Sequence, residues 1–214
     1  MQAPSPYPVQ FSVEYPDRQL NRLTTFFRII VAIPILIILG AISGGDWSFN
    51  WNDAGDDWQG TAAGTGGVLF FATAAMILVR QKYPRWWFDW HLELQRFTSR
   101  VFVYLALMDD QYPSTDERQS VQLDYVYPDA ARDLVRWMPL VKWLLAIPHW
   151  IVLIFLNIAA LVTVVIAWFA ILITGMYPRG LFDFVEGVMR WDNRVIGYAV
   201  TLVTDEYPPF SLDA

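Results

Sequence analysis

Residues 150–173 read WIVLIFLNIAALVTVVIAWFAILI and contain no charged side chain. This block is longer than the roughly 20 residues that an α-helix needs to cross a bilayer. A second uncharged block, IIVAIPILIILGAI, covers residues 29–42. Hydrophobic residues make up 55% of the 214-residue chain, which exceeds the usual share in soluble domains. The sequence therefore predicts an integral membrane protein.

Composition also excludes several kinds of function. The chain has no cysteine, so disulfides, thiol catalysis and iron-sulfur clusters are excluded. Its net charge is -6, and no cluster of Lys and Arg offers a surface for phosphates, which argues against nucleic acid as a partner. The N-terminus, MQAPSPYPVQ, has no basic stretch followed by an apolar core, so we expect no cleaved signal peptide.

Several short motifs occur twice. VQFSVEYPD at 9–17 is answered by VQLDYVYPD at 121–129, AIP at 32–34 by AIP at 146–148, and YPR at 83–85 by YPR at 177–179. This self-similarity predicts two tandem repeats that span nearly the whole chain. Their predicted bounds are 9–113 and 121–214, after an N-terminal tail at 1–8 and on either side of a linker at 114–120.

The first repeat holds about 20 extra residues, because the offset between copies falls from 114 at the AIP motifs to 94 at the YPR motifs. The extra residues form a segment rich in Gly, Trp and Asp at 44–66, which predicts a turn between two membrane helices. Each repeat is then a transmembrane hairpin, predicted at 23–43 and 67–82 and again at 138–157 and 158–176. One long tilted helix in the second repeat is the alternative, since neither Gly nor Pro marks a turn near Asn157.

The charges predict how the chain is oriented. None of the 15 Lys and Arg residues lies between residues 43 and 67, whereas that segment holds Asp46, Asp53, Asp56 and Asp57. By the positive-inside rule, both termini and the linker face the cytoplasm and the acidic loop faces outward. We therefore expect a multi-pass protein of the cytoplasmic (inner) membrane.

An amphipathic helix follows the second span of each repeat. Apolar residues recur at three- and four-residue spacing over 85–108 and over 179–202, which predicts helices suited to the membrane interface or to packing beneath the spans. Residues 9–15 and 121–127 alternate apolar and polar, which predicts half-buried strands. The tails LALMDDQYP and TLVTDEYPP are further strand candidates. The predicted fold is mainly α, with a small cytoplasmic β layer built from both repeats.

Two stretches carry a family resemblance. YPVQFSVEYPDRQLNRLTTFFRIIVAIPILIIL at 7–39 and GVMRWDNRVIGYAVTLVTDEYPPFSL at 187–212 resemble the bacterial membrane-protein family known as domain of unknown function 4389. The resemblance covers essentially the full chain and implies a membrane protein from a bacterial source. It implies no activity, cofactor or catalytic residue. The Trp-rich insert at 44–66 is longer than is usual in that family.

The polar residues that both copies keep are the main site candidates. They are Asp89, Arg96 and Arg100 in the first copy and Asp183, Arg190 and Arg194 in the second. Asp89 and Arg96 share a helix face but lie two turns apart, so each is expected to pair with another element and not with each other. Structural ion pairs and binding of anionic lipid headgroups are the two interpretations.

Three other features are weaker candidates. Pro34 and Pro148 predict kinks in membrane helices, either for packing or to line a cavity. Trp47, Trp51 and Trp58 make the outer loop a candidate contact surface. The aspartates of that loop lack the glutamate that would complete a calcium loop. His91 and His149 have no second histidine at metal-ligand spacing, so we expect neither a metal site nor a cofactor.

These observations favour a non-enzymatic membrane component, an assembly or accessory subunit that contacts lipids and either itself or another membrane protein. The alternative is a lipid-handling protein, transporter or channel. Between 150 and 173 the polar residues are Asn157 and Thr163, so a single chain offers no evident polar path across the membrane.

Overall fold

The structure is a computed structural model that describes residues 7–43, 65–115, 117 and 119–213. In these residues the chain is mainly helical, with seven α-helices, one π-helical segment and a two-stranded sheet. The elements follow the order β1 (Val9–Val13), α1 (Arg22–Phe26), α2 (Arg28–Ser43), α3 (Thr65–Ala75), η2 (Met76–Arg80), α4 (Arg85–Leu105), β2 (Val121–Tyr125), α5 (Pro139–Leu145), α6 (Ile147–Thr174) and α7 (Arg179–Ala199).

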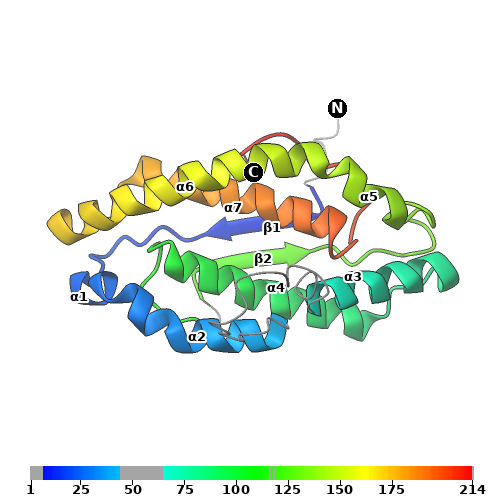
Figure 1. Cartoon of the computed structure of the whole chain (residues 1–214), viewed down its shortest axis with the longest axis horizontal. Coiled ribbons are helices and arrows are strands. Elements are labelled where there is room, and N and C mark those ends of the chain that lie inside the picture. Colours follow the sequence, from blue (N-terminus) through cyan, green and yellow to red (C-terminus); the bar gives the residue numbers. More distant parts are fainter. Residues whose placement is uncertain (1–6, 44–64, 116, 118, 214) are drawn as a thin grey trace, which may run out of the picture.

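The two strands pair with each other across the middle of the molecule (Figure 1). They are antiparallel, and Phe11 at the centre of β1 faces Leu123 at the centre of β2. Both strands bury every second side chain, as the alternation in the sequence predicts. Gln10, Ser12, Gln122 and Asp124 point to the opposite, exposed face of the sheet.

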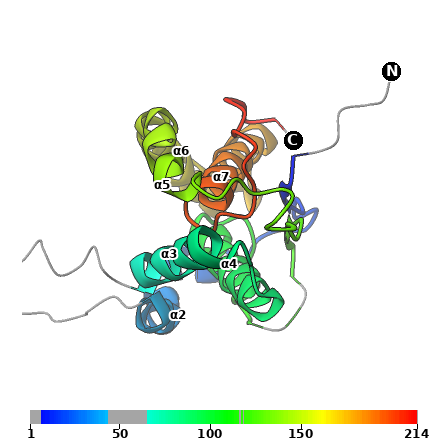
Figure 2. The ribbon, with the colours of Figure 1, turned by 90° about the vertical axis from the view of Figure 1, so that its right-hand side faces the viewer.

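The predicted amphipathic helices are present as α4 and α7, and they cover the buried face of the sheet. β1, from the first half of the chain, packs on α7 from the second half, and β2 packs on α4. The other sides of α7 and α4 contact α6 and α2 respectively. Seen along the helix axes, α2 and α6 lie on one side of the molecule, outside α4 and α7 (Figure 2). The amphipathic helices therefore separate the sheet from the most apolar helices.

The second apolar block is one helix, which corrects the predicted hairpin at 138–157 and 158–176. α6 runs without interruption from Ile147 to Thr174. The side chain of Asn157 donates to the Leu153 carbonyl one turn back and to the Asp192 carboxylate of α7, so this polar residue is accommodated without a turn. The helix break lies earlier, at Ala146, between α5 and α6.

In the first half of the chain, the apolar helical segments α2 and α3 are separate. α2 packs through Ala32 and Ile35 on the C-terminal half of α4, around Val101 and Tyr104. α3 lies at the other end of α4, where the Trp87 indole donates to the Thr73 hydroxyl at 2.8 Å. Since α2 and α3 follow α4 end to end, they do not form the expected antiparallel pair (Figure 1). Residues 44–64 between them lie outside the described residues.

The tails after α4 and α7 are irregular, so the two further strands expected there are not formed. Leu107 and Leu202 have φ angles of 64° and 58°, a left-handed conformation that interrupts an extended chain. The tail carbonyls bond to buried cations instead. The carbonyl of Asp109 accepts from Arg28 at 2.9 Å, and that of Thr204 accepts from Lys142 at 2.7 Å.

The close approach of β1 to α7 predicts a glycine requirement at position 197. A Cβ at Gly197 would lie 2.5 Å from a methyl group of Val9, whereas a Cβ at Gly180 on the same helix would meet nothing within 4 Å. We expect Gly197→Ala to lower the free energy of unfolding by about 2 kcal/mol through overpacking. Gly180→Ala is the control and should have no destabilising effect. Chemical unfolding in detergent measures both, and equal stabilities would contradict the packing described.

Candidate functional site: the apolar face and the arginine grooves

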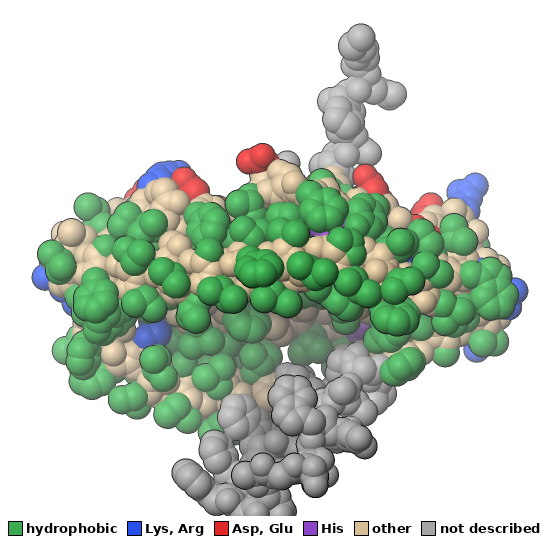
Figure 3. Space-filling model, turned by 45° about the horizontal axis from the view of Figure 1, so that its top comes forward, with side chains coloured by type: hydrophobic (Ala, Val, Ile, Leu, Met, Phe, Trp, Pro, Cys, Tyr) green, Lys and Arg blue, Asp and Glu red, His purple; other side chains and the backbone are tan. Residues whose placement is uncertain are grey.

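One face of the molecule is apolar (Figure 3). On α6 the exposed fractions of Phe155, Leu161 and Ile173 are 69%, 66% and 74%, and on α2 Ile29 is 76% exposed. Only 17% of the most apolar 18-residue window of α6 is buried, unlike the core helix of a soluble protein. Among the described helices, α6 alone is long and apolar enough to cross a membrane. We call the exposed surface of α1, α2, α5 and α6 the apolar face.

Two buried cations brace the apolar helices against the tails. Arg28, 2% exposed, forms an ion pair with Asp110 at 2.6 Å and lies over the Tyr104 ring. Lys142, 1% exposed, forms the matching pair with Asp205 at 2.6 Å and lies near the Tyr198 ring. Neither buried cation was singled out by its sequence context. The signal available was their spacing of 114 residues, which equals the offset between the AIP motifs at 32–34 and 146–148.

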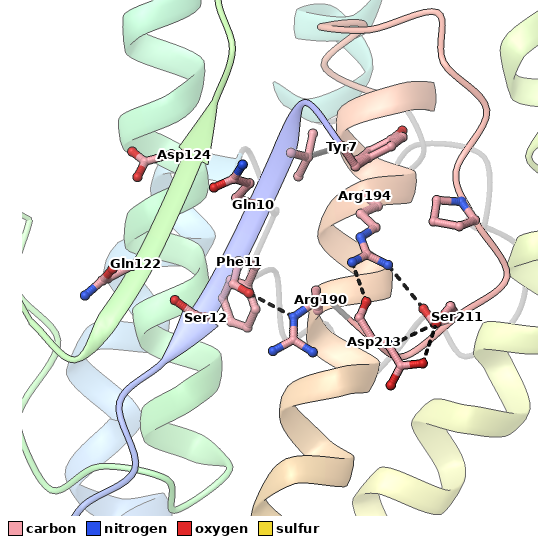
Figure 4. Close-up of a pocket in the computed structure, with 12 residues that line it drawn as sticks. Tyr7, Gln10, Phe11, Ser12, Gln122, Asp124, Arg190, Arg194, Ser211 and Asp213 are labelled. Atoms are coloured by element: carbon pink, nitrogen blue, oxygen red, sulfur yellow. Dashed lines mark hydrogen bonds between the residues drawn. The ribbon is translucent and has the colours of Figure 1, made fainter. Parts of the chain in front are cut away.

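Arg190 and Arg194 line a groove beside β1, with a volume of about 560 Å³ (Figure 4). Arg190 donates to the carbonyls of Phe11 and Leu212 and to the Glu186 carboxylate, at 3.0, 2.8 and 2.6 Å. Arg194 is buried and donates to the carbonyls of Ser211 and Asp213. The C-terminal tail therefore binds both guanidinium groups.

Arg96 and Arg100 line a similar groove of about 550 Å³ beside β2. Arg96 donates to the Leu123 carbonyl at 2.8 Å and forms ion pairs with Glu93 and Asp124. Arg100 is buried and donates to the Ser114 carbonyl at 2.8 Å. In both grooves, one arginine of the pair bonds to the central residue of the neighbouring strand.

The guanidinium groups in both grooves are therefore already bonded to carbonyl and carboxylate groups of the protein. A carbonyl or carboxylate that already accepts from a guanidinium would have to be displaced before a phosphate could bind there. The same bonds cover the outer edge of each strand with a positive charge, which opposes pairing with a strand of another chain. These contacts fit structural ion pairs better than lipid headgroup sites.

The two aspartates of the predicted set lie away from the grooves. Asp89 is exposed and its nearest cation is Arg85, at 3.7 Å on the preceding turn. Asp183 is also exposed. Exposed pairs at such distances contribute little stability. The structure therefore does not bring the two aspartates together with the four arginines.

The predicted kink residues occupy different positions. Pro34 lies inside α2. Pro148 lies in the first turn of α6, where its missing N–H removes no bond within that helix, and the break at Ala146 precedes it. Neither proline lines one of the grooves. Trp47, Trp51 and Trp58 lie outside the described residues.

Both histidines are buried among aromatic rings. Burial lowers the pKa of His91 to about 4, so its ring is neutral at pH 7, and it packs against Trp87. His149 accepts a hydrogen bond from the Trp191 indole at 3.0 Å and stacks on Phe210. Within the described ranges, no group of three or more His, Asp or Glu side chains has the arrangement of a metal site.

Three polar contacts were not predicted from the sequence. The hydroxyl of Tyr15 donates to the Tyr177 carbonyl, and that of Tyr127 donates to the Tyr83 carbonyl. Each bond joins a YPD motif of one half to a YPR motif of the other half. The repetition of both motifs was visible in the sequence, but their cross-pairing was not. The third contact is the bond between Asn157 and Asp192 described above.

Comparison with known proteins adds a family match for the second half of the chain. Residues 136–211 match the family described as Domain of unknown function (DUF4389). The matched region holds α5, α6, α7 and most of the C-terminal tail. No curated protein and no solved structure matches the chain significantly.

The contacts of Arg190 predict that a lysine cannot replace it. Lysine lacks the planar fork that reaches a strand carbonyl, a tail carbonyl and a carboxylate together. We expect Arg190→Lys to lower the free energy of unfolding by about 2 kcal/mol, since buried acceptors lose their donors. Arg132→Lys, at an exposed position, should change it by less than about 0.5 kcal/mol. Similar losses in the two variants would contradict a structural role for Arg190.

Asp192 predicts a pH dependence of stability. Burial raises the pKa of the Asp192 carboxyl group to about 6, so this group binds its proton more tightly in the folded protein than in the unfolded chain. Ionisation of this carboxyl group therefore lowers the free energy of unfolding, and the loss grows as the pH rises from about 4 through 6. We expect Asp192→Asn to raise the free energy of unfolding by about 1 kcal/mol at pH 7.5, a value reduced for partial exposure, and to have no such effect at pH 4.

Unfolding curves at several pH values in detergent provide this measurement. Asp183→Asn is the control, because that carboxylate is exposed on the same helix. A gain that is independent of pH would rule out ionisation of Asp192 as its cause.

Proposed function

We propose that this protein is an integral component of the bacterial cytoplasmic membrane that acts as a non-enzymatic assembly or accessory subunit. The observation that carries the proposal is the apolar face, whose large exposed side chains include Phe155 and Leu161 on α6. A soluble monomer rarely exposes a contiguous apolar patch of this extent. Lipid chains are the partner that the face fits directly.

The polar part of the surface supports a structural role for the protein in preference to a catalytic one. The polar groups that both copies keep are bonded to backbone and tail carbonyls within the chain. Both grooves are open depressions on the polar side of the molecule and not enclosed cavities in the lipid-facing part. The proposed task of the molecule is therefore to present a rigid polar surface at the membrane, for a second copy or for another membrane protein.

The proposal includes a duplicated architecture, with the two halves related by an approximate two-fold axis between Phe11 and Leu123. Matched contacts support it. Arg96 bonds to Leu123 and Arg190 bonds to Phe11, and the buried pairs of Arg28 and Lys142 occupy equivalent places. Such a molecule resembles a dimer within one chain, whose equivalent surfaces suit symmetric assembly.

The orientation follows from the same proposal. Both termini face the cytoplasm, because the Lys and Arg residues of the sequence lie outside the apolar blocks 29–42 and 150–173 and are absent from 44–66. Lipid handling or transport is the alternative. In the described part of α6, Asn157 is already bonded to Asp192, so it offers no free polar group for a path.

Two measurements test the proposal. The protein should remain in the membrane pellet after alkaline carbonate extraction. After gentle detergent extraction, the particle should have a discrete mass that exceeds the 24.7 kDa of one chain by whole copies or by a constant partner. A monomer that carries bound phospholipid would instead support the lipid-handling alternative, and release by carbonate would refute the membrane proposal itself.

The contribution of the Trp-rich loop at 44–66 to assembly requires its own variant. Replacing Trp47, Trp51 and Trp58 together with Ala asks whether this segment contributes to the assembly. Trp86→Ala, at a residue that is 67% exposed, is the matched control. The particle mass should fall with the triple variant and not with the control. An unchanged mass in both would remove the loop from the proposed contact.

A further inference from the structure

The distribution of charge around α6 is informative about its orientation in the membrane. At its C-terminal end, Gly175 accepts a backbone bond from Leu20 and lies close to the Arg22 guanidinium. At its other end, Arg136 precedes α5 and donates to the carbonyls of Leu78 and Val79. Basic side chains are accordingly visible at both ends of the long axis (Figure 3). A perpendicular α6 would place them on both sides of the membrane, against the positive-inside rule.

Polar groups also lie level with the interior of α6. Asn157, which bonds to Asp192 of α7, is ten residues into the helix, or roughly 15 Å from its start at 1.5 Å per residue. Two residues before Asp192, Arg190 reaches the centre of β1 at Phe11. The middle of the sheet is therefore level with the interior of α6 and not with one of its ends.

The outer face of this sheet is suited to water. Its exposed side chains are polar, and the Asp124 side chain, which pairs with Arg96, is 74% exposed. Were α6 perpendicular to the bilayer, these charges would lie inside a hydrocarbon core about 30 Å thick. Charged side chains in that position are costly and rare unless they face a protein or aqueous interior.

An orientation parallel to the membrane removes both conflicts. α2 and α6 lie on the same side of the molecule, and the sheet lies beyond α4 and α7 (Figure 2). A helix with its side chains is about 10–12 Å across, which fits within one leaflet of the hydrocarbon core. Exposed tryptophans near the starts of α4 and α5, Trp86 and Trp137, suit the headgroup region.

We propose that α2 and α6 lie in the plane of the membrane, embedded among the acyl chains of the cytoplasmic leaflet, and that neither end of α6 reaches the outer side. The sheet, the arginine grooves and both helix ends then face the cytoplasm together. All the basic residues of the described chain remain on one side without a crossing of the bilayer. This inference rests on the proposed membrane location and specifies which surface contacts lipid.

The absence of cysteine from the sequence allows a direct test. Single cysteines are introduced at exposed positions before α5 and after α6, as Arg132→Cys and Gly180→Cys, and on the outer face of the sheet, as Ser12→Cys. Ile158→Cys, at a residue that is 57% exposed on the apolar face, is the lipid-facing counterpart. Each variant is labelled in membranes with a maleimide that cannot cross the bilayer.

The first three variants should react fully in inside-out vesicles and remain unmodified in intact spheroplasts, while Ile158→Cys should be protected in both. Reaction of Arg132→Cys from one side and Gly180→Cys from the other would overturn the proposal and show that α6 crosses the bilayer. Asp133→Cys and Arg179→Cys form a second exposed pair if either first variant fails to fold. Loss of the protein from carbonate-washed membranes would indicate failure of the membrane proposal instead.

Discussion

The antiparallel pairing of β1 with β2 is the interaction on which the rest of the structure depends. Each strand packs on the amphipathic helix of the other half of the chain, β1 on α7 and β2 on α4. An isolated half would have a strand without its helix and a helix without its strand. The two tyrosine bonds between YPD and YPR motifs cross in the same way. Each half of the chain therefore completes its packing with elements of the other half, and the core forms only when both halves are present.

This packing between the halves produces a molecule with two different faces. α4 and α7 each have one side for the sheet and another for an apolar helix, so their own stripes are largely buried. The apolar helices are left with most of their surface exposed, and the sheet is left with a polar outer side. Contact with lipid on one side and with water on the other satisfies both surfaces. We regard this separation of faces as the main physical basis for the proposed membrane role.

The arginines on α4 and α7 make structural contacts within the chain. Guanidinium groups on α4 and α7 reach the central strand carbonyls and the tail segments, so they hold the sheet to its helices and close its edges. The buried pairs of Arg28 and Lys142 tie each apolar helix to a tail in a similar way. A buried ion pair is costly to break, because the remaining charge has no partner. These arginines and the two buried cations therefore bond mainly to groups within the chain.

The sequence by itself determined the local elements, because their signals are local. Alternation over five residues was sufficient for β1 and β2, and helical periodicity placed α4 and α7 within a few residues of their ends. The apolar composition of 150–173 was likewise sufficient for helical structure apolar enough to cross a membrane, but the hairpin predicted there was wrong. The tertiary structure alone decided that this block is one helix, since Asn157 can pair with Asp192 only when α7 lies beside it. It also decided that strands pair across the halves and that the tails accept bonds from buried cations, because these contacts join residues far apart in the chain.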